Sequence, residues 1–204
     1  MENKLYTKLK TYDFESLFAK KGYAYFTQGE YNLNIIGVRK AGIDVTNLFD
    51  DYIVVIFKRN GKTCRYIYAA TTDPGKYYMM DKLGSSKGTA ILVPNQYRGC
   101  WELGKHKGLY KALVQKKPVT VYRDGNKDAK YDFNPEKTDK GVFGINIHRS
   151  SAYTASKFVN NWSAGCQVFA SPVSYSSFIK YCDKQRELYG NSFTYTLLNE
   201  EDLI

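Results

Sequence analysis

Histidine, cysteine and methionine are all scarce in this chain. Its 204 residues include 2 His, 4 Cys and 3 Met. The cysteines are widely spaced and form no CxxC pair, so neither a zinc site nor a redox couple is indicated. A chain of this size does not need a disulfide framework, and we interpret Cys64 and Cys182 as packing residues, leaving Cys100 open. We expect no metal or cofactor.

Long apolar runs and recognisable targeting signals are also missing. The longest apolar run, Tyr52 to Phe57, is far shorter than the roughly twenty residues that span a bilayer. The segment from Met1 to Lys10 is charged and shows no secretory signal. No zinc-finger spacing or RNA-binding strand motif occurs, and the basic residues are spread along the chain. We therefore expect neither membrane insertion nor a nucleic-acid partner.

Positive charge and aromatic residues are plentiful. The net charge is +10, with 19 Tyr and 11 Phe, and the hydrophobic content of 43% excludes a disordered chain. The charge favours anionic partners such as a bacterial cell wall, although a solvated surface accounts for it equally well. Tyrosines suit half-buried sheets and open binding grooves alike.

The pattern along the chain is mainly β. Asn60-Gly61 predicts a hairpin between two strands, and apolar spacing predicts an amphipathic helix over Asp13–Lys20 and a helical turn over Gly108–Gln115. The predicted strands are Tyr31–Arg39, Asp51–Lys58, Thr63–Thr71, Gly88–Pro94 and Pro118–Tyr122. We expect a β-rich α+β fold in which residues 1–204 form one monomeric domain, with residues 1–50 as an N-terminal elaboration.

The candidate chemistry lies in one histidine and one cysteine. His148 precedes the glycine-flanked Cys166 by 18 residues. A nucleophilic thiol needs a nearby base, and imidazole is the usual one. Ile145 and Ile147 alternate with Asn146 and His148, so on a strand His148 would stand on an accessible face. Either residue alone would be read as structural, but together they indicate a thiol enzyme.

This arrangement resembles the L,D-transpeptidase catalytic domain, also called YkuD-like. A strand over Gly141–Ile147 ends at His148, a loop runs from Arg149 to Trp162, and Ser163-Ala164-Gly165-Cys166 follows. The continuation also fits, and the resemblance is strongest over Val119–Leu198. It comprises a short strand at Gln167–Ala170, a helix at Pro172–Tyr189 and a strand at Ser192–Leu198.

The resemblance implies a fold and a reaction. The fold would be a YkuD-like β-sandwich or open barrel with a helix after the cysteine. The reaction would be acyl transfer on peptidoglycan stem peptides through a thioester, with Cys166 as nucleophile and His148 as general base. The N–H groups of Gly165 and Cys166 are the candidates for the oxyanion site.

The same resemblance suggests which residues surround the substrate. Ala164 stands where family members carry a second histidine, and we expect His106, in a loop beside a strand, to line the same cleft instead. Arg149 would orient the imidazole or bind a substrate carboxylate. Trp162 would form a wall and Ser163 would support the loop. The full set of predicted substrate contacts is Arg149, Ser150, Ser163, Trp162, His106, Asn146 and Gln167.

Several alternatives stay open at this point. The chain could be a non-catalytic wall-binding module with the same fold or, less favoured, a basic nucleic-acid-binding protein. Transfer to an amine and hydrolysis are not distinguished by the residues, although a missing signal favours a lysin of phage or prophage type acting at the cell wall. Asp124 to Asp132 partly matches a calcium loop, and a polar hairpin turn is the favoured alternative.

Overall fold

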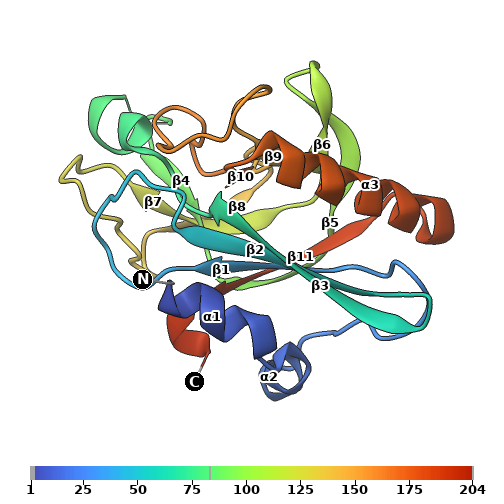
Figure 1. Cartoon of the computed structure of the whole chain (residues 1–204). Coiled ribbons are helices and arrows are strands. Elements are labelled where there is room, and N and C mark those ends of the chain that lie inside the picture. Colours follow the sequence, from blue (N-terminus) through green and yellow to red (C-terminus); the bar gives the residue numbers. More distant parts are fainter. Residues whose placement is uncertain (1–2, 83, 204) are drawn as a thin grey trace.

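The computed structural model describes residues 3–82 and 84–203, and these form a closed β-barrel with helices on two sides (Figure 1). The barrel contains eight strands in the order β1, β11, β5, β6, β9, β10, β3, β2. A smaller sheet of β4, β7 and β8 lies beside it. The prediction of a mainly β fold is confirmed, and the barrel is closed.

The strands have the following bounds in chain order. They are β1 (Asn34–Arg39), β2 (Asp51–Arg59), β3 (Lys62–Thr71), β4 (Thr89–Leu92), β5 (Asn95–His106), β6 (Tyr110–Gln115), β7 (Val119–Asp124), β8 (Thr138–Gly141), β9 (Ile147–Arg149), β10 (Gln167–Phe169) and β11 (Phe193–Asn199). Two pairings in the barrel are parallel, β1 with β11 and β9 with β10, and the others are antiparallel.

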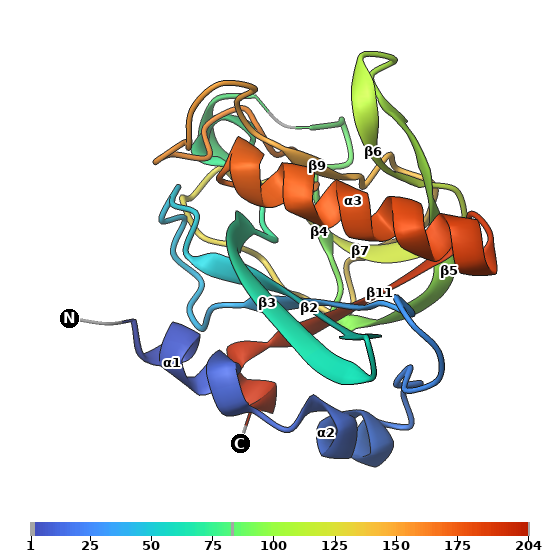
Figure 2. The ribbon, with the colours of Figure 1, turned by 45° about the vertical axis from the view of Figure 1, so that its right-hand side comes forward.

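The helices begin and end at identifiable caps. Helices α1 (Lys4–Thr11) and α2 (Phe14–Lys21) start at Asn3 and Asp13, whose side chains accept backbone N–H bonds. Helix α3 (Pro172–Tyr189) starts with the Ser171 side chain as its cap. Figure 2 shows α3 on one side of the barrel, with α1 and α2 on the opposite side. A π-helical turn spans Tyr77–Asp81, and a short 3-10 helix spans Glu200–Asp202.

Strand β2 is buried on both faces. Ile53, Val55 and Phe57 belong to the core inside the barrel and beneath α3, whereas Val54 and Ile56 pack in a second core with α1 and α2. A strand covered on both faces reads as a continuous apolar run instead of alternating. This is why the longest apolar run of the sequence lies here.

Some predicted elements are confirmed and others are wrong. The hairpin at Asn60-Gly61 joins β2 to β3, with both residues at positive φ. The helical turn predicted over Gly108–Gln115 is wrong, because this segment is the tip of a hairpin followed by β6. The single strand predicted over Gly141–Ile147 is also wrong. The chain leaves β8 at Gly141 and enters the three-residue β9 at Ile147.

In the segment from Asp124 to Asp132, side-chain oxygens accept hydrogen bonds from backbone N–H groups of the same segment. Asp124 accepts a hydrogen bond from the Asp132 N–H, Asn126 accepts one from Asp128, and Asp128 accepts one from Lys130. Among the described residues, no group of three or more His, Cys, Asp and Glu side chains is placed to hold a metal ion. These contacts support the turn interpretation. No described helix is both long and apolar enough to cross a membrane.

Candidate active site

A pocket of about 390 Å³ opens where the β5–β6 hairpin meets β9 and the loop that follows it. Its walls include His106 and Tyr110 from the two sides of the hairpin, His148 and Arg149 from β9, and Trp162 from the loop. His106 and Tyr110 face each other in the hairpin register. The fold thus brings both histidines of the chain into one pocket.

The two imidazoles stack on each other. Their ring centroids lie 4.0 Å apart, with 23° between the ring planes. Both residues are largely buried, His148 at 3% exposure and His106 at 7%. The accessible face predicted for His148 is therefore wrong, because the β5–β6 hairpin covers the face of β9 that carries it.

Hydrogen bonds assign a different proton position to each ring. His148 Nδ1 lies 2.8 Å from the carbonyl oxygen of Arg149, which only accepts, so the proton sits on Nδ1 and the lone pair on Nε2. Asn146 Oδ1 accepts the Gln115 N–H, which turns its amide nitrogen toward His106 Nδ1 at 3.1 Å. Neutral His106 therefore carries its proton on Nε2. His148 can therefore accept a proton on Nε2, and His106 can donate a hydrogen bond from Nε2.

Burial keeps both imidazoles neutral. Desolvation lowers the pKa of His148 to about 3, with a further decrease from His106, against the opposing effect of the Arg149 carbonyl. Desolvation and the charge of Lys107 lower the pKa of His106 to about 4. At neutral pH neither ring is an imidazolium.

Cys166 lies directly before β10 and next to Asn146, and it does not line the pocket of the two histidines. Its Sγ accepts the Asn146 N–H and donates to the Gly144 carbonyl, both at 3.4 Å. No hydrogen bond joins Sγ to His148 or His106 in the described chain. Desolvation raises the pKa of the thiol to about 11, while the Asn146 N–H and Lys107 act in the opposite direction. The resting thiol is neutral and is held by backbone groups.

The turn before Cys166 is built by Ser163 and Gly165. Ser163 Oγ accepts the Gly165 N–H at 3.1 Å and donates to the Cys166 carbonyl at 2.8 Å. The Gly165 N–H is therefore occupied, and its predicted place in the oxyanion site is corrected. The Cys166 N–H has no hydrogen-bond partner in the described chain, so it is the donor that remains.

The other predicted substrate contacts divide into two groups. Ser150 and Trp162 line the pocket, although the Ser150 hydroxyl is bound to the Ala170 carbonyl. Gln167 and Ser163 are fully buried. Gln167 donates to the Thr72 and Gly165 carbonyls and accepts from the Tyr195 hydroxyl. The prediction that Gln167 contacts the substrate is therefore corrected: this residue supports the Cys166 turn from inside the barrel.

Tyr110 and Lys107 are site residues that sequence reasoning missed. The Tyr110 hydroxyl lies 3.2 Å from His148 Nδ1 and donates to the Arg149 carbonyl at 3.1 Å. Lys107 affects the pKa values of His106, His148 and Cys166 together. The signal that could have found them is the hairpin itself, since a turn after His106 places Tyr110 opposite it.

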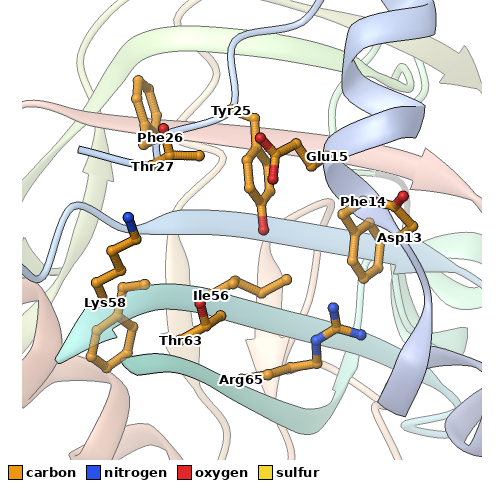
Figure 3. Close-up of a pocket in the computed structure, with 11 residues that line it drawn as sticks. Asp13, Phe14, Glu15, Tyr25, Phe26, Thr27, Ile56, Lys58, Thr63 and Arg65 are labelled. Carbon is orange, nitrogen blue, oxygen red and sulfur yellow. The ribbon is translucent and has the colours of Figure 1, made fainter. Parts of the chain in front are cut away.

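A second hollow of about 430 Å³ lies between α2 and the β2–β3 hairpin (Figure 3). It contains no histidine or cysteine. The guanidinium of Arg65, drawn at its edge, already donates to the carbonyls of Leu9 and Tyr12. The two pockets are therefore distinguished by their chemical groups and not by their size.

Comparison with known proteins gives no independent assignment: no protein-family model, no curated protein and no solved structure matches this chain. The site is therefore interpreted from its own geometry.

Replacing His148 with glutamine should change how stability depends on pH. Below about pH 6.5 the unfolded chain protonates His148, whereas the folded protein does not until about pH 3, so acid favours unfolding. In this window the wild type should lose about 1.4 kcal/mol per pH unit relative to His148→Gln. Denaturant titrations at pH 7.5, 6, 5 and 4 measure the difference. Titrating groups that do not interact with His148 cancel between the two proteins, and a pH-independent difference would show that His148 is not held neutral.

Proposed function

We propose that this protein is a cysteine acyl-transfer enzyme of the L,D-transpeptidase type, with a YkuD-like fold, acting on peptidoglycan stem peptides. One observation carries the proposal. Cys166, Asn146, His106 and His148 form a continuous chain of contacts, and the two histidines of this chain line a pocket of about 390 Å³. The Ser163-Ala164-Gly165-Cys166 segment, which resembles the family motif, forms the turn that holds the thiol.

The proposed reaction begins with a proton transfer. The Cys166 thiol leaves the Gly144 carbonyl and gives its proton to His148 Nε2 as Sγ attacks the carbonyl carbon of the scissile peptide bond. The tetrahedral adduct collapses when the C–N bond breaks and the proton on His148 passes to the departing amine. A thioester on Cys166 remains, and an amine or water then accepts the acyl group.

Two donors are available for the developing oxyanion. The Cys166 N–H has no partner within the described chain, and neutral His106 carries a proton on Nε2, as its Nδ1 contact with Asn146 requires. His106 would take over the contribution that a second histidine makes in the family motif, where this chain has Ala164. Preorganised donors of this kind account for a large part of acyl-transfer catalysis.

The experiment is incubation of purified muropeptides with the wild type and with Cys166→Ala, followed by mass spectrometry. We expect cleaved or exchanged peptides with the wild type only, because the alanine variant has no nucleophile. Cys182→Ala is a matched control, since Cys182 lies on the buried face of α3, packs in the core and does not line the pocket. Exchange with an added D-amino acid would identify a transferase, and simple loss of a residue would identify a hydrolase. The absence of any wild-type-dependent product refutes the proposal.

A non-catalytic wall-binding module is the second candidate. It is favoured by the neutral thiol and by the missing hydrogen bond between Cys166 and an imidazole among the described residues. Such a module would sediment with purified sacculi equally well as wild type and as Cys166→Ala, and would never form an adduct with a carbapenem. A carbapenem adduct on Cys166, seen by intact mass, would exclude this alternative.

A further inference from the structure

Arg149 is a cation at the candidate site without an acidic partner. Three other arginines, Arg39, Arg123 and Arg186, lie 2.7 to 3.2 Å from a carboxylate oxygen. Arg149 forms no ion pair with any residue that the structure describes, and its Nη1 makes one long hydrogen bond, 3.4 Å, to the Ser150 carbonyl. A half-buried guanidinium that lines a pocket is thus left with most of its donors unused.

The Arg149 side chain is nevertheless held in place. Its Cζ lies 4.1 Å from the centroid of the Tyr110 ring, and the Tyr110 hydroxyl is fixed by the Arg149 carbonyl. Stacking restrains a guanidinium through its face and leaves its edge, with the paired N–H groups, available. That edge matches a carboxylate, which it can bind through two parallel hydrogen bonds.

The charge of the pocket also favours a carboxylate ligand. Lys107 and Arg149 are the charged residues that line it, and no aspartate or glutamate does. His106 and His148, which also line it, are neutral at pH 7. A cleft with cations alone attracts an anionic ligand and penalises a neutral one of the same shape.

We propose that Arg149, assisted by Lys107, binds a carboxylate of the substrate and makes the pocket select free-acid peptides over their amides. The inference rests on the proposed function, because it takes the ligand to be a stem peptide. Two positions of such a peptide can supply the carboxylate, the chain terminus and an acidic side chain. The guanidinium chemistry is the same for both, so the experiment separates them.

The test is binding to Cys166→Ala, which cannot turn the peptide over. The probes are synthetic stem peptides with both carboxylates free, with the terminus amidated, or with the side chain amidated, and titration calorimetry measures the affinity. We expect one of the two amides to bind about 10- to 100-fold more weakly than the free acid, the range for a charge-assisted hydrogen-bonded pair. The weaker amide identifies the source of the carboxylate.

Variants of Arg149 then show whether this residue causes the preference for the free acid over the amide. Adding Arg149→Gln should abolish the preference, and Arg149→Lys should retain only part of it, because lysine keeps the charge without the fork. Arg98→Gln is the matched control, since Arg98 is an exposed arginine stacked on Phe26 and outside the pocket. Thermal unfolding of each variant checks that it is folded.

The outcomes separate this inference from the proposed function. Equal binding of all three peptides, absence of binding, or a preference that survives in Arg149→Gln overturns the inference. Muropeptide turnover by the wild type without any preference would refute the carboxylate contact alone. A preference that depends on Arg149, combined with no turnover, would refute the enzyme and leave the carboxylate contact in place.

Discussion

Alkylation of Cys166 by iodoacetamide is expected to accelerate about tenfold with each pH unit, or about 1,000-fold between pH 7 and pH 10, because only the thiolate reacts. The pKa of the thiol is raised to about 11, so throughout this range the thiolate fraction keeps rising. The residue is partly exposed, which allows the reagent to reach it. Tryptic mapping by mass spectrometry at timed quench points gives the rate at Cys166 itself.

The denatured chain is the reference for this measurement. An unfolded cysteine has a pKa of about 8.5, and its alkylation rate levels off above that pH, so at pH 7 it should react roughly 300-fold faster than folded Cys166. A rate that is already flat between pH 7 and pH 9 in the folded protein would reveal a thiolate–imidazolium pair. The proposed mechanism, in which the proton moves only during attack, would then be wrong.

Gly165→Ala should destabilise the protein strongly and remove Cys166 from its position. Gly165 has a φ of +120°, which residues with a side chain rarely adopt, and a Cβ there would collide with the carbonyl oxygen of Ala90. Backbone strain together with overpacking against a rigid strand should cost on the order of 3 kcal/mol or more. Urea unfolding gives the stability, and the iodoacetamide rate reports the position of the thiol.

Gly144→Ala provides the matched control for Gly165→Ala. Gly144 also has positive φ, +75°, and its carbonyl accepts the Cys166 thiol, but nothing lies within 4 Å of a Cβ built on it. Its substitution should cost only the conformational term, about 1 to 2 kcal/mol. Equal destabilisation by the two substitutions would show that the contact with Ala90 is not what requires glycine at position 165.

Local sequence signals predicted the parts of the fold that are decided locally. Asn-Gly adopts the left-handed conformation readily, so the β2–β3 hairpin was visible, and Ser171-Pro172 marks the start of α3. The β5–β6 hairpin was not recognised. Its tip, Lys107-Gly108, has the composition of an ordinary loop, and the pairing that defines it joins residues across that tip.

The sequence suggested which residues to consider for the candidate site, but it did not predict what surrounds them. The spacing of His148 and Cys166 suggested the pair, and His106 was expected in the same cleft. The structure places His106 and His148 in one pocket, which Cys166 does not line. Alternation along a short segment predicted an exposed His148, because it takes no account of what covers a strand. The Gly165 N–H is occupied by the nearby Ser163 hydroxyl, which the motif did not indicate, and Gln167 is held by the hydroxyl of Tyr195, which is distant in sequence.

The parallel pairing of β1 with β11 has a consequence for how the protein acquires its shape during synthesis. Ile35 lies beside Tyr195 in this pairing, so the barrel cannot close until the segment Phe193–Asn199 has been made. Contacts so remote in sequence slow folding, since a long loop must be ordered before they form. During synthesis, the segments that carry His148 and Cys166 can therefore pair with their neighbours only as part of an open sheet until β11 has been made.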